Sequence, residues 1–182
     1  MKEIALLSAV DRQWGIGCHN ELLFHLSKDM EMFRKRTIHQ IVIMGRKTLE
    51  SLPGGKPLPN RKNIVLSRKK GCHNLYESQE DGVSVFQSVR EALDYVKDET
   101  KEVFVIGGAE IYRQFLPFST TAYITEIDAQ RQADCFFPDL RKDSQWIRIS
   151  ESRIHKDQSG VEFRFVKYRR VGAAADFRAD CL

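Results

Sequence analysis

Short runs of apolar, often β-branched residues recur along the chain, and polar or helical stretches separate them. Such runs are typical of strands, and several lack the alternation of apolar and polar residues that marks a strand with one face in water. This pattern favours strands buried on both faces of a parallel sheet. The predicted strands span residues 4–10, 41–44, 64–66, 83–86, 103–106 and 122–127.

Helical patterns lie between these strands. We predict helices at 27–37, with Ser27 as the N-cap, at 89–97, and at 109–115, where Pro117 ends the helix. Strands that alternate with helices predict the α/β class. Residues 146–155 and 161–169 flank a turn-like segment, so an antiparallel hairpin is expected at one edge of the sheet.

The length of 182 residues fits a single domain, which we place at residues 1–170, followed by a tail at 171–182 whose role the sequence does not indicate. Twenty-nine Lys and Arg against 25 Asp and Glu leave a formal charge of +4, which suits a small anionic ligand better than a long nucleic acid. No apolar run approaches the ~20 residues of a membrane span, and the first residues lack the pattern of a signal peptide. We therefore expect a cytoplasmic monomer without a membrane partner.

The cysteines and histidines do not form a recognisable metal motif. The chain has 4 Cys and 5 His, and none of them follows the spacing of a zinc cage or a metalloprotease helix. The sequence therefore predicts reduced, non-catalytic thiols and no metal.

Cations and hydroxyls follow two of the predicted strands, at the carboxyl ends where open parallel sheets bind ligands. Strand 41–44 is followed by Gly45, Arg46, Lys47 and Thr48, and Thr48 is placed to cap a short helix. Strand 64–66 is followed by residues 67–70, a serine and three cations. Either cluster alone is better explained as a solvated surface, but their repetition indicates a phosphate site.

A pair of glycines, Gly107 and Gly108, joins strand 103–106 to the next helix. Such a turn could admit a pyrophosphate against the helix N-terminus. The pair does not match G-x-G-x-x-G, and packing of a tight turn explains it equally well. Together with the nearby cations, it favours a phosphorylated dinucleotide.

Asp29 is the candidate carboxylate. On a helix it lies about 40° from Phe33 and about 60° from Leu26, on the apolar face that also holds Met30. A carboxylate in an apolar pocket has a raised pKa and needs a cationic or amidine-like partner, and this face offers no Lys or Arg. The simpler alternative is that Asp29 complements the helix dipole.

Five motifs then resemble one family in their order and spacing. They comprise residues 9–12 with 15–17, 43–48, 57–63, 105–112, and 125–128 before 136–138. From about residue 4 to 169 the chain resembles a dihydrofolate reductase of the short bacterial type. The resemblance implies an eight-stranded, mostly parallel twisted sheet flanked by helices, with a C-terminal antiparallel hairpin. It also implies NADPH-dependent reduction of 7,8-dihydrofolate to tetrahydrofolate, by hydride transfer to pterin C6 and protonation at N5, in support of one-carbon metabolism.

The resemblance assigns roles to individual residues. Asp29 would bind the pterin 2-amino group and N3 with support from Thr125, and Arg61 would pair with the glutamate α-carboxylate. Residues 14–24 match a mobile loop over the nicotinamide, on which Leu22 excludes water. The substrate side, which antifolate inhibitors could also occupy, comprises Leu7, Ser8, Met30, Phe33, Leu52, Leu58, Arg61 and Ile106, whose apolar members could otherwise be plain core. The NADPH side comprises Ala9, Ile16, Gly17, Gly45, Arg46, Lys47, Thr48, Ser67, Arg68, Gly107, Gly108, Ala109, Glu110, Ile111 and Tyr112.

Residues 22–29 depart from the pattern Leu-Pro-Trp-x-Leu-Pro-x-Asp that is common in this family. Phe24 replaces the tryptophan and cannot donate the indole N–H that helps to order a water near the pterin carbonyl. A catalytically weak or silent protein that binds pterin or NADPH is therefore an alternative. A pyrimidine reductase of riboflavin synthesis with the same fold is another, although it is not expected to carry both Asp29 and Arg61. Nucleic-acid binding is weaker still, because aromatic residues do not alternate with the cations.

Overall fold

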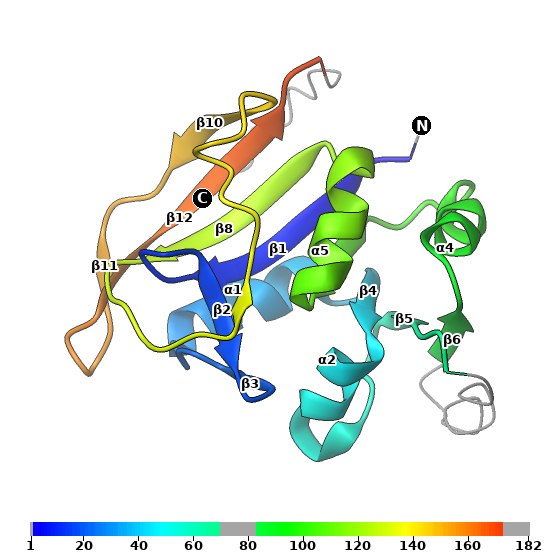
Figure 1. Ribbon diagram of the computed structural model, residues 1–182, viewed down its shortest axis with the longest axis horizontal. Helices are drawn as coiled ribbons and strands as arrows, with labels where there is room; N and C mark the ends of the chain where they lie inside the picture. Colours follow the sequence, from blue (N-terminus) through cyan, green and yellow to red (C-terminus); the bar gives the residue numbers. More distant parts are fainter. Residues whose placement is uncertain (1, 70–82, 173–182) are drawn as a thin grey trace.

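A twisted central sheet runs through the molecule, with helices on both faces (Figure 1). The computed structural model describes residues 2–69 and 83–172. Eight strands follow one another across the sheet in the order β10-β12-β8-β1-β7-β4-β5-β6, and the short β11 (His155–Lys156) pairs with β12. The other strands are β1 (Ile4–Val10), β4 (Ile41–Gly45), β5 (Lys62–Leu66), β6 (Val83–Phe86), β7 (Val103–Gly107), β8 (Thr121–Ile127), β10 (Trp146–Glu151) and β12 (Glu162–Arg170).

Most neighbouring strands are parallel. The pairs from β8 through β1, β7, β4 and β5 to β6 are all parallel, whereas β12 is antiparallel to both β8 and β10. The C-terminal hairpin turns at Gly160, whose amide donates to the carbonyl of Asp157. The predicted α/β class, the mostly parallel sheet and the edge hairpin are therefore confirmed.

The unbroken apolar run of β4 reflects burial on both sides of the sheet. Residues 41–44 are all 0% exposed. Ile41 and Ile43 belong to the cluster that also contains Ala92 and Phe115, and Val42 and Met44 belong to a second cluster on the opposite face. A strand covered on both faces has no reason to alternate with polar residues.

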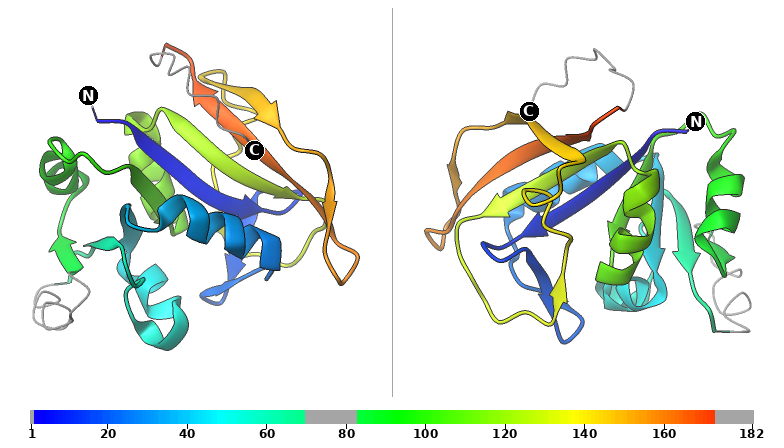
Figure 2. Two further views of the ribbon diagram at one scale, coloured as in Figure 1. Left: turned by 180° about the vertical axis from the view of Figure 1, so that it is seen from behind. Right: turned by 45° about the horizontal axis from the view of Figure 1, so that its top comes forward.

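In the described residues four helices cover the sheet: α1 (Ser27–Thr37), α2 (Arg46–Ser51), α4 (Val89–Val96) and α5 (Ala109–Phe115). Short 3-10 turns, η1 (Pro53–Gly55) and η2 (Leu116–Phe118), follow α2 and α5. The front and back views place α1 and α5 on opposite faces of the sheet (Figures 1 and 2). The three predicted helices are thus present, with α4 ending one residue earlier than expected.

Both predicted side-chain caps were wrong. The N-cap of α1 is Leu26, which makes no side-chain cap bond, and Ser27 is the first helical residue. The buried Leu26 side chain fixes where the chain enters the helix, one residue before the serine. At α2 the strand ends at Gly45, which is itself the N-cap, so Thr48 falls inside the helix.

A second, small sheet forms where a loop was expected. It has the order β3-β2-β9, from β2 (Gly15–Cys18), β3 (Glu21–Leu22) and β9 (Cys135–Phe136). Figure 1 shows it beyond the end of β1. Residues 15–22 are therefore a hairpin held to a distant segment.

Two predictions lie largely outside the described residues. These are the tail, of which only Val171 and Gly172 are described, and the last cation of the cluster at 67–70. Within the described ranges no helix is long and apolar enough to cross a membrane.

Candidate active site

The register of the parallel strands brings the predicted phosphate-binding segments together. Gly45 at the end of β4 pairs with Leu66 at the end of β5, and Met44 pairs with Gly107 at the end of β7. The residues that follow these strands therefore leave the sheet at one edge. Arg46–Thr48, Ser67–Lys69 and the glycine pair thus follow strands that end at the same edge of the sheet.

The glycines at this edge let α2 and α5 approach each other. Gly107 has φ +129°, a conformation that side chains rarely adopt. A Cβ on Gly108 would lie 3.3 Å from the Thr48 hydroxyl oxygen, and one on Gly45 would lie 3.0 Å from Cγ1 of Ile111. The structure thus supports packing as one reason for the glycines.

The same glycines leave backbone donors at the starts of two helices. Gly45 and Gly108 are the N-caps of α2 and α5, and neither helix has a side-chain cap bond. The first amides of a helix have no partner inside it and favour an anion. A glycine-lined edge of this kind fits the phosphates of a dinucleotide.

The side chains around this edge differ in their exposure and in their contacts within the protein. Lys47 and Arg68 are exposed, whereas Arg46 pairs with Glu50 at 2.5 Å. Ser67 is buried, and its hydroxyl accepts from the Lys69 amide at 3.2 Å.

Two predicted cofactor residues on α5 have their side chains engaged within the protein. Glu110 pairs with Arg113 at 2.9 Å. Ile111 packs against the main core cluster. Together with Ala109, these residues present the backbone of the first turn of α5 to the glycine edge.

The candidate carboxylate is bonded to a residue far away in the sequence. The Thr125 hydroxyl donates to Oδ1 of Asp29 at 2.5 Å, which joins β8 to the first turn of α1. Asp29 is half-buried, and this desolvation raises the pKa of its carboxyl above the ordinary value, while the Thr125 hydrogen bond opposes the rise. A carboxylate that has lost its hydration in this way is stabilised by a ligand that donates two hydrogen bonds to it.

Several of the predicted substrate residues keep part of an apolar surface uncovered. Met30 is 46% exposed, and Leu22, which the sequence assigned to the loop over the nicotinamide, is 55% exposed. Five others are half-buried: Leu7, Phe33, Leu52, Leu58 and Ile106. A fully packed core would cover them, so these side chains are available to an apolar ligand.

Tyr112 connects the glycine edge to the carboxylate. Its buried hydroxyl donates to the carbonyl oxygen of Leu7 at 2.7 Å, and a Cβ on Gly107 would lie 3.5 Å from that hydroxyl. Burial raises the pKa of Tyr112, a hydrogen bond with Ser8 opposes the rise, and the charge of Asp29 adds to it. The sequence placed Tyr112 on the cofactor side alone, whereas the structure places its hydroxyl beside β1.

Ala9 also lies beside the hydrogen-bonded pair of Asp29 and Thr125. It is paired with Thr125 across β1 and β8. Ile16, on the hairpin, packs against the main core cluster.

Arg61 is held at the C-terminal end of α1. Its Nε donates to the Thr37 hydroxyl at 2.8 Å, and its Nη1 donates to the carbonyl of Pro59 at 2.7 Å. Burial lowers the pKa of Arg61, and so does the positive charge of Arg34. Because Arg61 and Arg34 repel each other at a partly buried site, a bound carboxylate would stabilise the positive charge of both. Arg34 carries no signal that marks it in the sequence.

Phe24 is packed into an apolar cluster at the entry to α1. Its neighbours there include Leu26 and Phe165. The Arg131 guanidinium lies over the ring at 4.3 Å and donates to the carbonyl of Leu23 at 2.5 Å. Arg131, which the sequence did not point to, thus fixes the residues that lead into α1.

The hairpin beside the site depends on close contacts and on a buried carboxylate. A Cβ on Gly15 would lie 2.7 Å from Cβ of Ala133, and one on Gly17 would lie 2.9 Å from the carbonyl oxygen of Glu21. Asp11, only 3% exposed, accepts from the amides of Gln13 and Gly15 at 2.9 Å each. These contacts give Gly17 a structural role and place Asp11 as the anchor of the hairpin.

The fold and the site define a class of α/β proteins built on one large central sheet. In this class a half-buried carboxylate and a glycine-lined, cationic edge lie at the carboxyl ends of the central strands. The chain belongs to the dihydrofolate reductase family, whose sequence model matches residues 3–170.

Similar proteins cover nearly the same span. The chain is 35% identical over 172 residues to dihydrofolate reductase of Bacillus subtilis (strain 168), with 94% of this chain and 96% of the relative covered. It is 39% identical over 151 residues to the Haemophilus influenzae enzyme of the same name, with 83% and 88% covered. It also superposes on the solved structure of dihydrofolate reductase from Enterococcus faecalis complexed with NADP(H) and RAB-propyl. That match has a TM-score of 0.81 and 29% identity, and it covers 93% of this chain and 96% of the other.

Proposed function

We propose that this chain reduces 7,8-dihydrofolate to 5,6,7,8-tetrahydrofolate with NADPH. The observation that carries the proposal is the Asp29–Thr125 pair, which lies among incompletely covered apolar side chains in a chain of this family. Neither alternative from the sequence, a silent binding protein or a pyrimidine reductase, is favoured by the family and structural matches.

Asp29 orients the pterin ring. Its carboxylate accepts hydrogen bonds from the 2-amino group and N3, which replace the hydration lost on burial. Its negative charge favours the protonated form of the ring and therefore protonation at N5. Thr125 holds the carboxylate in place and supports its ionised form.

NADPH supplies the hydride that is transferred to pterin C6. The exposed Lys47 and Arg68, with Arg46 and Ser67, bind the 2′-phosphate of the adenosine half. Gly45, Gly107 and Gly108 let the backbone at the starts of α2 and α5 approach the pyrophosphate. Leu22, exposed on the hairpin, excludes water above the reacting ring.

Arg61 binds the glutamate end of the substrate. Its guanidinium is already fixed by Thr37 and Pro59, so it can present a fork to the α-carboxylate without losing further rotamer freedom. Arg34 strengthens the positive potential there. We further propose that the protein acts as a monomer in the cytoplasm.

The test is the fall in NADPH absorbance when dihydrofolate is added to the purified protein. We expect turnover by the wild type, and a large loss with Asp29→Asn that recovers partly at low pH, where solution protonates N5 in place of the carboxylate. Tight NADPH binding without turnover would support the silent binder instead. An unchanged pH profile in Asp29→Asn would remove this carboxylate from its role.

A further inference from the structure

The turn that joins β2 to β3 places a thiol beside an imidazole. Its two central residues, His19 and Asn20, have φ values of +51° and +64°, the backbone of a two-residue hairpin turn. In a regular strand the side chains of neighbouring residues point to opposite faces. The left-handed turn ends that alternation, and Cys18 Sγ comes to lie 3.4 Å from Nδ1 of His19.

A carboxylate from a distant segment completes the group. The backbone amide of Asp134 donates to the carbonyl of Gly17 at 3.1 Å, and Oδ2 of Asp134 accepts from the backbone amide of His19 at 2.8 Å. Two hydrogen bonds therefore seat Asp134 against the hairpin. One ligand atom each from Cys18, His19 and Asp134 lies within 4.8 Å of the others.

We propose that Cys18, His19 and Asp134 bind a divalent transition-metal ion, with Zn²⁺ the best match. Thiolate, imidazole and carboxylate are the donors that zinc takes in proteins. Tetrahedral zinc, with Zn–S of about 2.3 Å and Zn–N of about 2.0 Å, requires a sulfur-to-nitrogen separation of about 3.5 Å. The observed 3.4 Å is already close to that value, and the carboxylate closes the third position with a small movement.

The surroundings allow an ion to enter and to be held. His19 and Asp134 are exposed and Cys18 is half-buried, so the ligands are open to solvent. A carboxylate has about four lone-pair sites, so Asp134 can keep its bond from the His19 amide and still bind a metal. Three protein ligands leave the fourth position to water.

Metal binding would add a link between two chain segments that hydrogen bonds and side-chain packing already join. The hairpin carries Leu22, which we place over the reacting ring, and Asp134 precedes β9. The bound ion would hold the hairpin to β9 and slow its opening. This consequence for the reaction rests on the proposed function, whereas the metal site itself does not.

Cys135 supplies a matched control. A Cβ on Gly17 would lie 4.0 Å from Cβ of Cys135, so the Cys135 side chain lies on the Gly17 face of the small sheet. Cys18 is the next residue along β2, and its sulfur belongs to the metal-binding group, whereas the Cys135 thiol is hydrogen-bonded to the Asp134 carboxylate and is not part of that group. Serine keeps a donor to that carboxylate, so Cys135→Ser removes the second sulfur without removing this hydrogen bond. The two cysteines are thus close in space, and we assign the sulfur of Cys18 but not that of Cys135 as a metal ligand.

The experiment measures Zn²⁺ affinity of the reduced protein by competition with a chromogenic chelator, and coordination by the visible absorption of the Co²⁺ form. We expect one ion at the site and a tetrahedral Co²⁺ spectrum with a sulfur-to-metal band. Cys18→Ser, His19→Gln and Asp134→Asn should each lower the affinity at least about tenfold, and Cys135→Ser should not. His19→Gln keeps the backbone amide that bonds Asp134, so its loss of affinity would report the imidazole rather than a misplaced hairpin.

Equal affinity in Cys18→Ser and the wild type, or an equal loss in Cys135→Ser, would overturn the site. The proposed link between the hairpin and β9 has a separate readout, the rate of backbone hydrogen exchange over residues 15–22. Zn²⁺ should slow that exchange in the wild type and in Cys135→Ser but not in Cys18→Ser. Zn²⁺ binding without slower exchange would show that the ion does not hold the hairpin to β9. None of these readouts uses turnover, so their failure is distinct from failure of the proposed function.

Discussion

Thr125 and Asp29 act as a pair in which the hydroxyl controls the charge of the carboxylate. The hydrogen bond favours ionised Asp29 and opposes the rise in pKa that desolvation causes. A hydrogen bond to a charged group is worth about 1.5–3 kcal/mol, and one pKa unit corresponds to about 1.36 kcal/mol. Thr125→Val should therefore raise the apparent pKa in the pH dependence of kcat/KM, because the hydrogen bond that favours the ionised carboxylate is lost. Thr125→Ser, which keeps the donor, should leave that pKa near the wild-type value, and equal profiles in all three proteins would contradict the coupling.

Arg61 should matter for one end of the substrate only. Its guanidinium contacts Thr37 and Pro59, at the far end of α1 from Asp29. We expect Arg61→Leu to raise KM for dihydrofolate at least about tenfold, as loss of a charge-assisted bidentate contact should. Steady-state kinetics with a dihydropterin that lacks the glutamate should show little change, and NADPH affinity should be unaltered. A similar loss with the shortened substrate would place Arg61 elsewhere.

The sequence pointed to single residues of the site but not to the bonds between them. Helical periodicity placed Asp29 on an apolar face, and the structure finds it half-buried there. The bond from Tyr112 to Leu7 spans 105 residues, and the one from Arg131 to Leu23 spans 108. Contacts of such separation leave no local pattern, so Arg34, Arg131 and the anchor Asp11 could only be found once the strands were paired.

The four helices of the described ranges differ in how they begin, and this gives a matched pair of substitutions. At α4 the Ser88 hydroxyl accepts from the amide of Glu91, whose carboxylate in turn accepts from the amide of Gln87. Ser88→Ala should therefore lower the free energy of unfolding by about 1 kcal/mol. Ser27→Ala should change it little, because Ser27 caps nothing. Urea unfolding of both variants checks this, and an equal loss at both positions would contradict the assigned caps.

Elements were predictable where they were long and periodic. The runs at 41–44 and 103–106 became β4 and β7, each within one residue of the expected bounds. The strands β2, β3, β9 and β11 have two to four residues each. A strand of that length shows no period, and glycine in β2 weakens the strand signal further. These short strands exist because tertiary contacts, such as that of Gly15 with Ala133, hold them.

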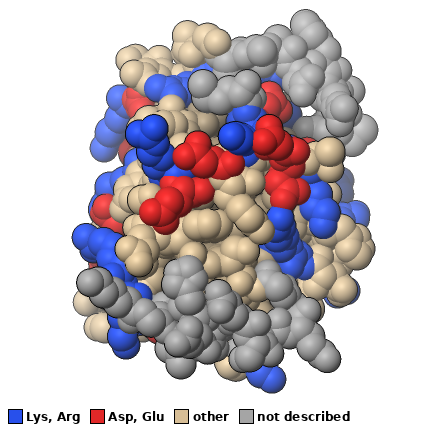
Figure 3. Space-filling model, turned by 90° about the vertical axis from the view of Figure 1, so that its right-hand side faces the viewer, with Lys and Arg blue, Asp and Glu red and all other residues tan. Residues whose placement is uncertain are grey.

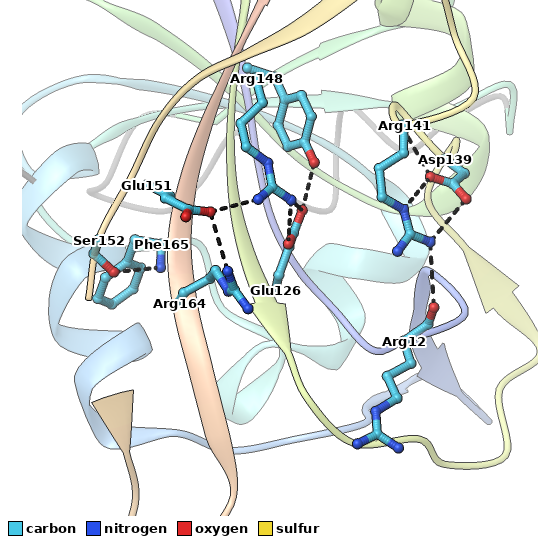
Figure 4. Close-up of polar contacts among 10 residues, drawn as sticks. Arg12, Glu126, Asp139, Arg141, Arg148, Glu151, Ser152, Arg164 and Phe165 are labelled. Atoms are coloured by element: carbon cyan, nitrogen blue, oxygen red, sulfur yellow. Dashed lines mark hydrogen bonds and ion pairs between the residues drawn. The ribbon is translucent and has the colours of Figure 1, made fainter. Parts of the chain in front are cut away.

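Several charges in the described part of the molecule are paired with near neighbours. Figure 3 shows one end of the molecule, where acidic side chains lie between basic ones; Lys62 pairs with Glu99 in the described part of the chain. In Figure 4, Arg148 lies between Glu126 and Glu151, at 2.9 and 2.6 Å. Burial and Glu126 together raise the pKa of Tyr168, in the same network, to about 12.

The exposed cations near the glycine pair predict which binding step responds to salt. Lys47 is exposed and makes no ion pair with a described residue, and Arg68, which follows β5 at the same sheet edge, is also exposed. Exposed charges are screened strongly, since the Debye length falls from about 30 Å at 0.01 M to about 3 Å at 1 M salt. Raising ionic strength should therefore weaken NADPH binding several-fold and NADH binding much less, because NADH lacks the 2′-phosphate. Fluorescence titration of both nucleotides checks this, and equal losses would remove these cations from the 2′-phosphate site.

The half-buried Asp29 also bears on how the protein responds to selection. Because folding raises the pKa of this carboxyl, the folded state loses stability as pH rises from the unfolded pKa through the folded pKa, and the whole deficit is present above the latter. An uncharged residue at position 29 escapes that deficit at neutral pH. A library screened only for resistance to heat would thus enrich replacements of Asp29 and discard the carboxylate that we propose orients the pterin.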